Sequence, residues 1–186
     1  MREPRLITER LVLRRWEESD LGPFALLNGD PETMRHFPAP LPREASDAMV
    51  HRIEAGFDRD GLGHFAVELV ASGQLAGAVG LSKVPPPMPF APAVEVGWRL
   101  DRRYWGHGYA TEAAEAVLGY AFNDKGFDEV VSFTAAVNEP SRAVMERLGM
   151  HRNPAEDFLQ PGLPDDHRLQ PHVLYRLSRE QWEAGA

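Results

Sequence analysis

The chain contains no cysteine, and this absence excludes several kinds of site. Without thiols there can be no disulfide framework, no thiolate nucleophile and no cysteine-ligated zinc centre. Long apolar runs are missing as well: no segment approaches the length of a membrane span, and the first ten residues lack the apolar core of a secretory signal. We therefore expect a protein that works in the cytoplasm and does not bind membranes.

The chain also has fewer basic than acidic residues. The 20 lysines and arginines are outnumbered by 28 aspartates and glutamates, which gives a net charge of −8. This balance argues against general nucleic-acid binding and favours a cationic ligand or acceptor. The content of 43% hydrophobic and 26% charged residues is that of an ordinary globular protein. With no linker or repeat, we expect residues 1–186 to form a single domain, as a monomer or a homodimer.

Metal-binding patterns are missing too. The chain has seven histidines, but their spacing matches no paired motif such as H-E-x-x-H. We therefore predict no metal site.

One stretch, residues 94–111 (VEVGWRLDRRYWGHGYAT), combines a strand, a glycine turn and the start of a helix. Residues 94–100 are rich in β-branched and aromatic side chains, as strands are. Gly106 and Gly108 then form a tight turn, after which apolar residues recur at helical spacing. A helix begins with unpaired N–H groups and a partial positive charge, and glycines let an anion approach them closely. The stretch therefore predicts a phosphate site, with Arg103 as a nearby cation.

Three kinds of phosphate loop compete for this segment. A P-loop requires Gly-Lys-Ser/Thr, and no such triplet occurs here. A dinucleotide fingerprint beginning at Gly106 would need glycine or alanine at position 111, which is Thr111. The third kind fits best: residues 103–112, RYWGHGYATE, resemble the R/Q-x-x-G-x-G/A pyrophosphate loop of the GCN5-related N-acetyltransferase (GNAT) superfamily.

Two further segments resemble the same superfamily in the same order. Residues 8–14, TERLVLR, are similar to the opening strand of its RimJ/RimL-like branch. Residues 138–150, NEPSRAVMERLGM, resemble its N-x-x-S/A…L-G-F segment, with Met150 in place of the usual phenylalanine. Together the three segments span most of the chain.

The resemblance implies a mixed α/β (α+β) fold. Its central sheet is mixed but mostly antiparallel, is flanked by helices, and is splayed between the two strands that hold acetyl-coenzyme A. The residue pattern predicts strands at 6–16, 64–71, 75–83, 94–100, 129–137 and 172–177. It predicts helices near residues 21–27, from Asp30, at about 43–60, from residue 110 and from Asn138. It also predicts a capped turn at 178–182 and a proline-stiffened loop at 84–92.

By the same resemblance, two groups of residues would hold acetyl-coenzyme A. The backbone of Trp98, Arg99 and Leu100 would pair with the pantetheine arm like an added strand, with Asn138 and Ser141 on its other side. The pyrophosphate would lie on the loop that follows, held by N–H groups of Gly106, Gly108 and Ala110, by Arg103 and by the Thr111 hydroxyl. His107 and Tyr109 belong to the same loop.

Acetyl transfer to an amine also needs a proton acceptor and a proton donor. Glu95 is the first candidate for the general base and Glu68, on a neighbouring strand, is the second, each acting directly or through a water. Many family members place a tyrosine in the short helix as the thiolate's proton donor, but here that position holds Met145. The hydroxyls of Ser141 and Tyr175 are the candidate substitutes.

The sequence therefore predicts an acetyl-coenzyme A-dependent N-acetyltransferase that transfers acetyl directly to a primary amine in a ternary complex. The acceptor would be a protein N-terminus, as the RimJ/RimL resemblance implies, or a small-molecule amine. The alternative is a non-catalytic acyl-coenzyme A-binding or sensor module of the same fold. Met145 at the usual donor position keeps that alternative open.

Overall fold

Nine strands form one open sheet in the computed structural model, which describes residues 4–185. The strand order is β1-β2-β3-β4-β5-β6-β9-β7, and β8 pairs with β9. The strands are β1 (Leu6–Ile7), β2 (Leu11–Arg14), β3 (His64–Leu69), β4 (Leu75–Val84), β5 (Ala93–Leu100), β6 (Glu129–Ala135), β7 (His151–Arg152), β8 (Phe158–Leu159) and β9 (Pro171–Ser178).

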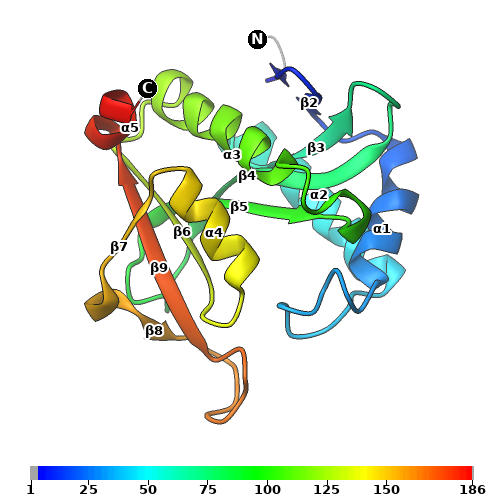
Figure 1. The fold of residues 1–186 in the computed structure, drawn as a ribbon. Coiled ribbons are helices and arrows are strands. Elements are labelled where there is room, and N and C mark those ends of the chain that lie inside the picture. The colour runs from blue at the N-terminus through cyan, green and yellow to red at the C-terminus, as the bar shows by residue number, and fades with distance from the viewer. Residues whose placement is uncertain (1–3, 186) are drawn as a thin grey trace.

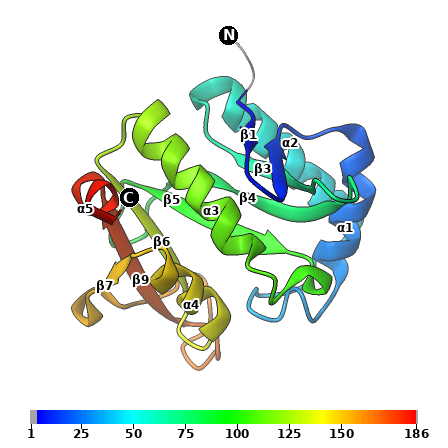
Figure 2. The same ribbon diagram turned by 45° about the horizontal axis from the view of Figure 1, so that its top comes forward.

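Helices cover both faces of this sheet (Figures 1 and 2). They are α1 (Leu21–Gly29), α2 (Arg43–Asp60), α3 (Tyr109–Gly119), α4 (Glu139–Arg147) and α5 (Arg179–Gly185). Short 3-10 turns lie at η1 (Glu18–Asp20), η2 (Arg102–Tyr104) and η4 (Pro154–Glu156), and α3 continues into the π-helical turn η3 (Tyr120–Asp124).

Every strand pair is antiparallel except β5 with β6, which run parallel. These two strands share a single register pair, Glu95 with Val131, and then diverge. In Figure 1 they open a V in the sheet beside α3 and α4. The predicted fold class, a mixed α/β fold around a mostly antiparallel, splayed sheet, is confirmed.

Helix α3 provides the apolar face that its spacing predicts. Ala113, Ala114, Val117 and Leu118 are fully buried against the sheet. On the opposite face, α1 and α2 pack through Phe24, Leu27 and Val50 against Ala66 and Ala78 of β3 and β4. The sheet is therefore fixed between two helical layers, and the splay between β5 and β6 is left beside α3.

Two predicted elements are wrong. The strand expected at 6–16 is two strands, because the chain turns at Thr8, whose hydroxyl accepts a hydrogen bond from the Leu11 N–H at 3.0 Å. The helix expected from Asp30 is a turn: the Asp30 carboxylate accepts from the Thr33 N–H at 2.9 Å, but no helix follows. Pro38, Pro40 and Pro42 come next and supply no N–H donors.

The other elements lie close to their predicted positions. Helix α2 has the predicted bounds and ends at Gly61, which adopts a left-handed conformation (φ 70°). The strands predicted at 64–71 and 129–137 end two residues early, at Leu69 and Ala135. The proline-rich loop at 84–92 lies between β4 and β5 as expected.

Candidate active site

The turn from β5 into α3 presents an uncapped helix N-terminus. Gly106 (φ 77°) and Gly108 (φ 81°) are both left-handed, a conformation that glycine adopts without strain. Gly108 is the N-cap of α3, and no side chain caps this helix. By contrast, the N-terminus of α4 is capped by Asn138, whose side chain accepts from the Ser141 N–H. The first N–H groups of α3 are therefore free to bind an anion.

This N-terminus lines a cavity of about 1200 Å³ between the diverging strands. Ten of the residues predicted to bind the cofactor lie on its wall. They are Trp98, Arg99, Leu100, Gly106, Gly108, Tyr109, Ala110, Thr111, Asn138 and Ser141. The structure thus brings together the strand, the glycine turn and the start of α4 around one space.

The edge of β5 that faces this cavity has no strand beside it. After the Glu95–Val131 pair, the Ser132 hydroxyl of β6 donates to the Val96 carbonyl at 2.9 Å, and the two strands separate. The Leu100 carbonyl accepts from the Trp105 indole N–H at 2.9 Å. Residues 97–99 therefore present an open strand edge, to which an extended ligand with amide groups can pair as an added strand.

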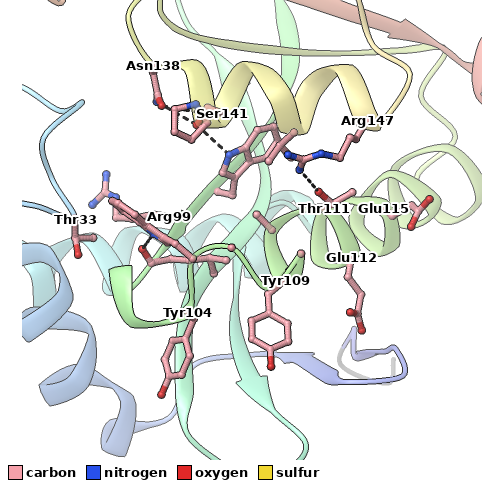
Figure 3. A pocket seen from close by; sticks show the side chains of 18 of the residues that line it. Thr33, Arg99, Tyr104, Tyr109, Thr111, Glu112, Glu115, Asn138, Ser141 and Arg147 are labelled. Atoms are coloured by element: carbon pink, nitrogen blue, oxygen red, sulfur yellow. Dashed lines mark hydrogen bonds between the residues drawn. The ribbon is translucent and has the colours of Figure 1, made fainter.

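Ser141 lies on α4 opposite this edge (Figure 3). Its Oγ accepts hydrogen bonds from the Trp98 indole N–H at 3.2 Å and from the Asn138 side-chain amide at 3.1 Å. The same Asn138 amide donates to Thr134 Oγ1 at 2.8 Å, which fixes its orientation. Because both contacts use Ser141 Oγ as the acceptor, its own hydroxyl hydrogen is free for another partner.

A second cavity, of about 680 Å³, adjoins the first. Six residues line both: His36, Phe37, Trp98, Arg99, Asn138 and Ser141. We call the first space the cofactor cleft and the second the acceptor cavity. Their shared wall means that two ligands can meet beside Ser141.

Glu95 and His64 lie on the floor of the acceptor cavity. Burial raises the pKa of Glu95 to about 7, and a long contact with the Ser82 hydroxyl at 3.5 Å opposes the shift. Burial and then the positive charge of Arg99 lower the pKa of His64 to about 4. Both side chains reach within 3.2 Å of the point that a Cβ would occupy on Gly97, so a side chain at residue 97 would fill the space between them.

Four predicted site residues lie away from these spaces. Glu68 forms an ion pair with Arg14 at 2.8 Å, and the buried Tyr175 donates to Glu146 at 3.0 Å; neither residue lines a cavity. Arg103 is ion-paired with Asp101 at 2.7 Å, and its side chain is 67% exposed. His107 stacks on Tyr109 with ring centroids 5.5 Å apart and contacts the Trp105 carbonyl through Nδ1, outside the cleft wall. These positions favour Glu95 over Glu68 as base and Ser141 over Tyr175 as donor.

One cation at the cleft was missed by the sequence analysis. Arg147, on α4, donates to the Thr111 hydroxyl at 3.2 Å and lines the cofactor cleft (Figure 3). The sequence did contain a sign of this position: Ser141, Val144 and Arg147 are spaced three residues apart, which puts them on one face of the helix, and all three line the cleft. Only the packing of α4 against α3 shows that this side chain reaches the start of α3.

Among residues 4–185 there is no cluster of three or more histidine, aspartate or glutamate side chains arranged to hold a metal. Within the same residues, none of the helices combines the length and the apolar character needed to cross a bilayer.

In this protein the sheet is splayed, and the open edge of β5 leads into an uncapped helix N-terminus. These features are typical of a class of proteins that hold an extended, phosphate-bearing ligand between two strands. Comparison with known proteins gives the family. Residues 10–151 match the model described as the acetyltransferase (GNAT) domain, so the chain belongs to the GNAT acetyltransferases, which use acetyl-coenzyme A.

The relatives agree with this assignment. The chain is 32% identical over 151 residues to YkkB, an uncharacterized protein of Bacillus subtilis, covering 79% of this chain and 85% of that protein. A GNAT-family acetyltransferase from Bacillus anthracis superposes with a TM-score of 0.78 at 25% identity, over 95% of this chain and 99% of that one. RimL, a ribosomal alpha-N-protein acetyltransferase in complex with coenzyme A, shares the fold with a TM-score of 0.77 at 15% identity, over 94% and 98% of the two chains.

Proposed function

We propose that this acetyltransferase transfers acetyl from acetyl-coenzyme A directly to a primary amine while both substrates are bound. One observation carries the proposal: the anion-binding cofactor cleft and the acceptor cavity, which holds the titratable Glu95, share a wall at Ser141 and Trp98. With no cysteine in the chain, a thiol-linked acetyl-enzyme is excluded. Two adjoining binding spaces are what a ternary complex requires.

The cofactor cleft fits acetyl-coenzyme A through its backbone. The N–H groups of Gly108 and the first residues of α3 would hold the pyrophosphate, with the Thr111 hydroxyl beside them. Arg147 would add a positive charge at the same place. The open edge of β5 over residues 97–99 would hold the two amide groups of the pantetheine arm. In this arrangement the thioester would lie beside Ser141.

The amine must lose a proton in order to attack. At pH 7 a lysine-like amine with a pKa of about 10.4 is neutral in only about 0.04% of molecules, and an α-amine with a pKa of about 7.7 in about 15%. Glu95, with its pKa raised to about 7, is about half ionised at that pH and can accept this proton directly or through a water. Burial also disfavours the charged form of the amine itself.

The transfer is balanced by a proton delivered to sulfur. Once the ammonium proton has passed to Glu95, the amine nitrogen forms a bond to the acetyl carbonyl carbon and the carbon–sulfur bond breaks. The nitrogen then loses its second proton to become the amide, and that proton goes to the departing thiolate, which becomes the coenzyme A thiol. The free hydroxyl hydrogen of Ser141 would stabilise the sulfur by a hydrogen bond, or would pass to it while Ser141 takes up the proton leaving the nitrogen; the buried Met145 has nothing to donate.

The test is a titration of the purified protein with acetyl-coenzyme A by calorimetry, followed by thiol release across a panel of amines and short peptides. We expect binding together with thiol release that depends on the amine. Binding without release from any amine would contradict transfer and favour a sensor. Absence of binding would overturn the assignment of the cofactor cleft.

A further inference from the structure

Arg99 is a cation without an anionic partner at the junction of the two cavities. Its Nη1 donates to the Asn28 side-chain oxygen at 2.7 Å, and its guanidinium lies 4.1 Å from the centre of the Phe37 ring. In the part of the chain that the structure describes, its Nε and Nη2 make no hydrogen bond, and no carboxylate lies within ion-pair distance. Since these atoms are not buried against protein, they are available to a ligand.

The surrounding structure holds this guanidinium in place. Asn28 and Ser46 are both completely buried, and the Asn28 amide N–H donates to Ser46 Oγ at 2.9 Å. That bond orients the Asn28 amide so that its oxygen faces Arg99. Two buried polar side chains on α1 and α2 are thus arranged to position one cation at a cavity wall.

A partly buried cation without an anion is costly, and two other partly buried arginines of this protein have carboxylate partners. Arg14 is paired with Asp20 and Glu68, and Arg15 with Glu54 and Asp58. Burial lowers the pKa of Arg99 only to about 10, so it remains charged at neutral pH. We therefore infer that the ligand supplies the anionic partner of Arg99.

Besides Arg99, the acceptor cavity is lined by three basic side chains, Arg52, Arg59 and Lys83, and by two carboxylates, Asp60 and the partly ionised Glu95. Asp60 is shared by Arg59 and Lys83, so it leaves no negative charge to offset Arg99. Arg52 also lines the cavity, and no carboxylate of the described residues lies within ion-pair distance of it. Burial lowers the pKa of the cavity histidines His36, His64 and His172 and so disfavours their charged forms.

We propose that the acceptor of this enzyme is an amine that also carries a carboxylate, and that Arg99 binds that carboxylate while Glu95 receives the proton of the amine. The inference rests on the proposed acetyl transfer and specifies its substrate: amino acids and short peptides with a free carboxylate rather than polyamines or simple alkylamines. Planar guanidinium groups pair with carboxylates through two parallel hydrogen bonds, and Nε and Nη2 supply both donors.

The experiment compares matched acceptors with and without the carboxylate. Alanine, alanylalanine and 4-aminobutyrate are each assayed against the corresponding amide by acetyl-coenzyme A-dependent thiol release. For the best pair we expect kcat/KM to be about 10- to 100-fold higher for the carboxylate, mostly through KM. In Arg99→Gln that preference disappears; because Arg99 also lines the cofactor cleft, the Kd of acetyl-coenzyme A is measured for the same variant, and the assays are run at saturating acetyl-coenzyme A. Arg43→Gln, an exposed helix arginine that lines neither cavity, keeps the preference.

Binding provides an independent readout that does not need turnover. The protein saturated with coenzyme A is titrated with the N-acetylated product of each pair, and we expect the carboxylate forms to bind and the amides to bind at least 10-fold more weakly. Equal or absent binding of both forms, or faster acetylation of the amides, polyamines or intact protein N-termini, would overturn the proposal. Failure of acetyl-coenzyme A to bind would instead overturn the proposed function.

Discussion

The cofactor cleft is formed mainly by backbone groups, whereas the acceptor cavity is formed by side chains. The cleft consists mainly of backbone: an open strand edge at residues 97–99 and the free N–H groups that follow Gly108. The acceptor cavity consists of side chains from distant segments, among them His36, His64 and Glu95. Backbone groups are the same in every residue, so the cleft can hold a ligand that many sequences share. Side chains differ from protein to protein, so under the proposed function we expect the cavity to determine which acceptor is used.

The two spaces also differ from the protein as a whole in charge. The chain carries a net charge of −8, which favoured a cationic acceptor. The acceptor cavity nevertheless contains Arg52 and Arg99 without carboxylate partners among the described residues. A positive wall also disfavours an ammonium ion, which assists the deprotonation that the reaction needs. The local charge of a site can therefore oppose the net charge of the molecule.

The largest effect is expected from the acceptor side. Glu95→Gln removes the base and keeps the shape of the side chain, so kcat should fall by about 10²- to 10³-fold at pH 7, while the Kd of acetyl-coenzyme A stays the same. Steady-state kinetics with calorimetry of acetyl-coenzyme A binding separate the two quantities. An equal loss of cofactor binding would contradict the division between the two spaces.

The pH dependence sharpens the same test. Glu95 must be ionised to accept a proton, so with a lysine-like acceptor the wild-type kcat/KM should fall as the pH drops below about 7 and level off above it. Without the base, the variant depends on the neutral amine alone, and its rate should keep rising about tenfold per pH unit between pH 6 and 9. A variant with the wild-type plateau would show that another group is the base.

The next effect is expected in the cofactor cleft. Gly108→Ala places a Cβ at a left-handed position and should shift the start of α3, raising the Kd of acetyl-coenzyme A about tenfold or more. The matched control is Gly73→Ala, at φ 66° in the turn between β3 and β4, where nothing lies within 4 Å. Both changes should lower the free energy of unfolding by about 1–2 kcal/mol. Only Gly108→Ala should weaken binding. Equal Kd values for the two variants would contradict binding of the ligand by the N–H groups at the start of α3.

The difference between a backbone cleft and a side-chain cavity explains which parts of the site could be predicted from the sequence. The strand–glycine–helix pattern predicted β5 and the start of α3, and residues 98–100, 106 and 108–111 of that pattern line one cleft, because local residue order determines this backbone geometry. The acceptor cavity depends on which distant strands become neighbours, as in the row His64, Gly80 and Gly97 across three strands. Arg103 was predicted from its place in the motif, yet its side chain turns to Asp101. The motif marks a cation at this position but does not show that the neighbouring Asp101 neutralises it.

At the boundary between the two spaces we expect an intermediate effect. Ser141→Ala removes the free hydroxyl and leaves the Trp98 and Asn138 donors without their acceptor. The kcat should fall about tenfold, and Ser141→Thr, which keeps the hydroxyl, should recover most of it. The comparison is made at saturating acetyl-coenzyme A, so that a binding effect does not enter. If alanine retains the full kcat, Ser141 is only a contact to the pantetheine arm.

The smallest effect distinguishes the two candidate cations of the cofactor cleft. Arg147→Gln should raise the Kd of acetyl-coenzyme A about 3- to 10-fold, because it removes an exposed charge beside the start of α3, and the loss should shrink at high salt. Arg103→Gln is the matched comparison: its charge is already neutralised by Asp101 and lies outside the cleft wall, so its Kd should stay within about twofold of wild type. The reverse result, a larger loss from Arg103→Gln, would mean that Arg103 leaves Asp101 when the ligand binds. In that case the sequence motif, rather than the ligand-free packing, would identify the phosphate-binding arginine.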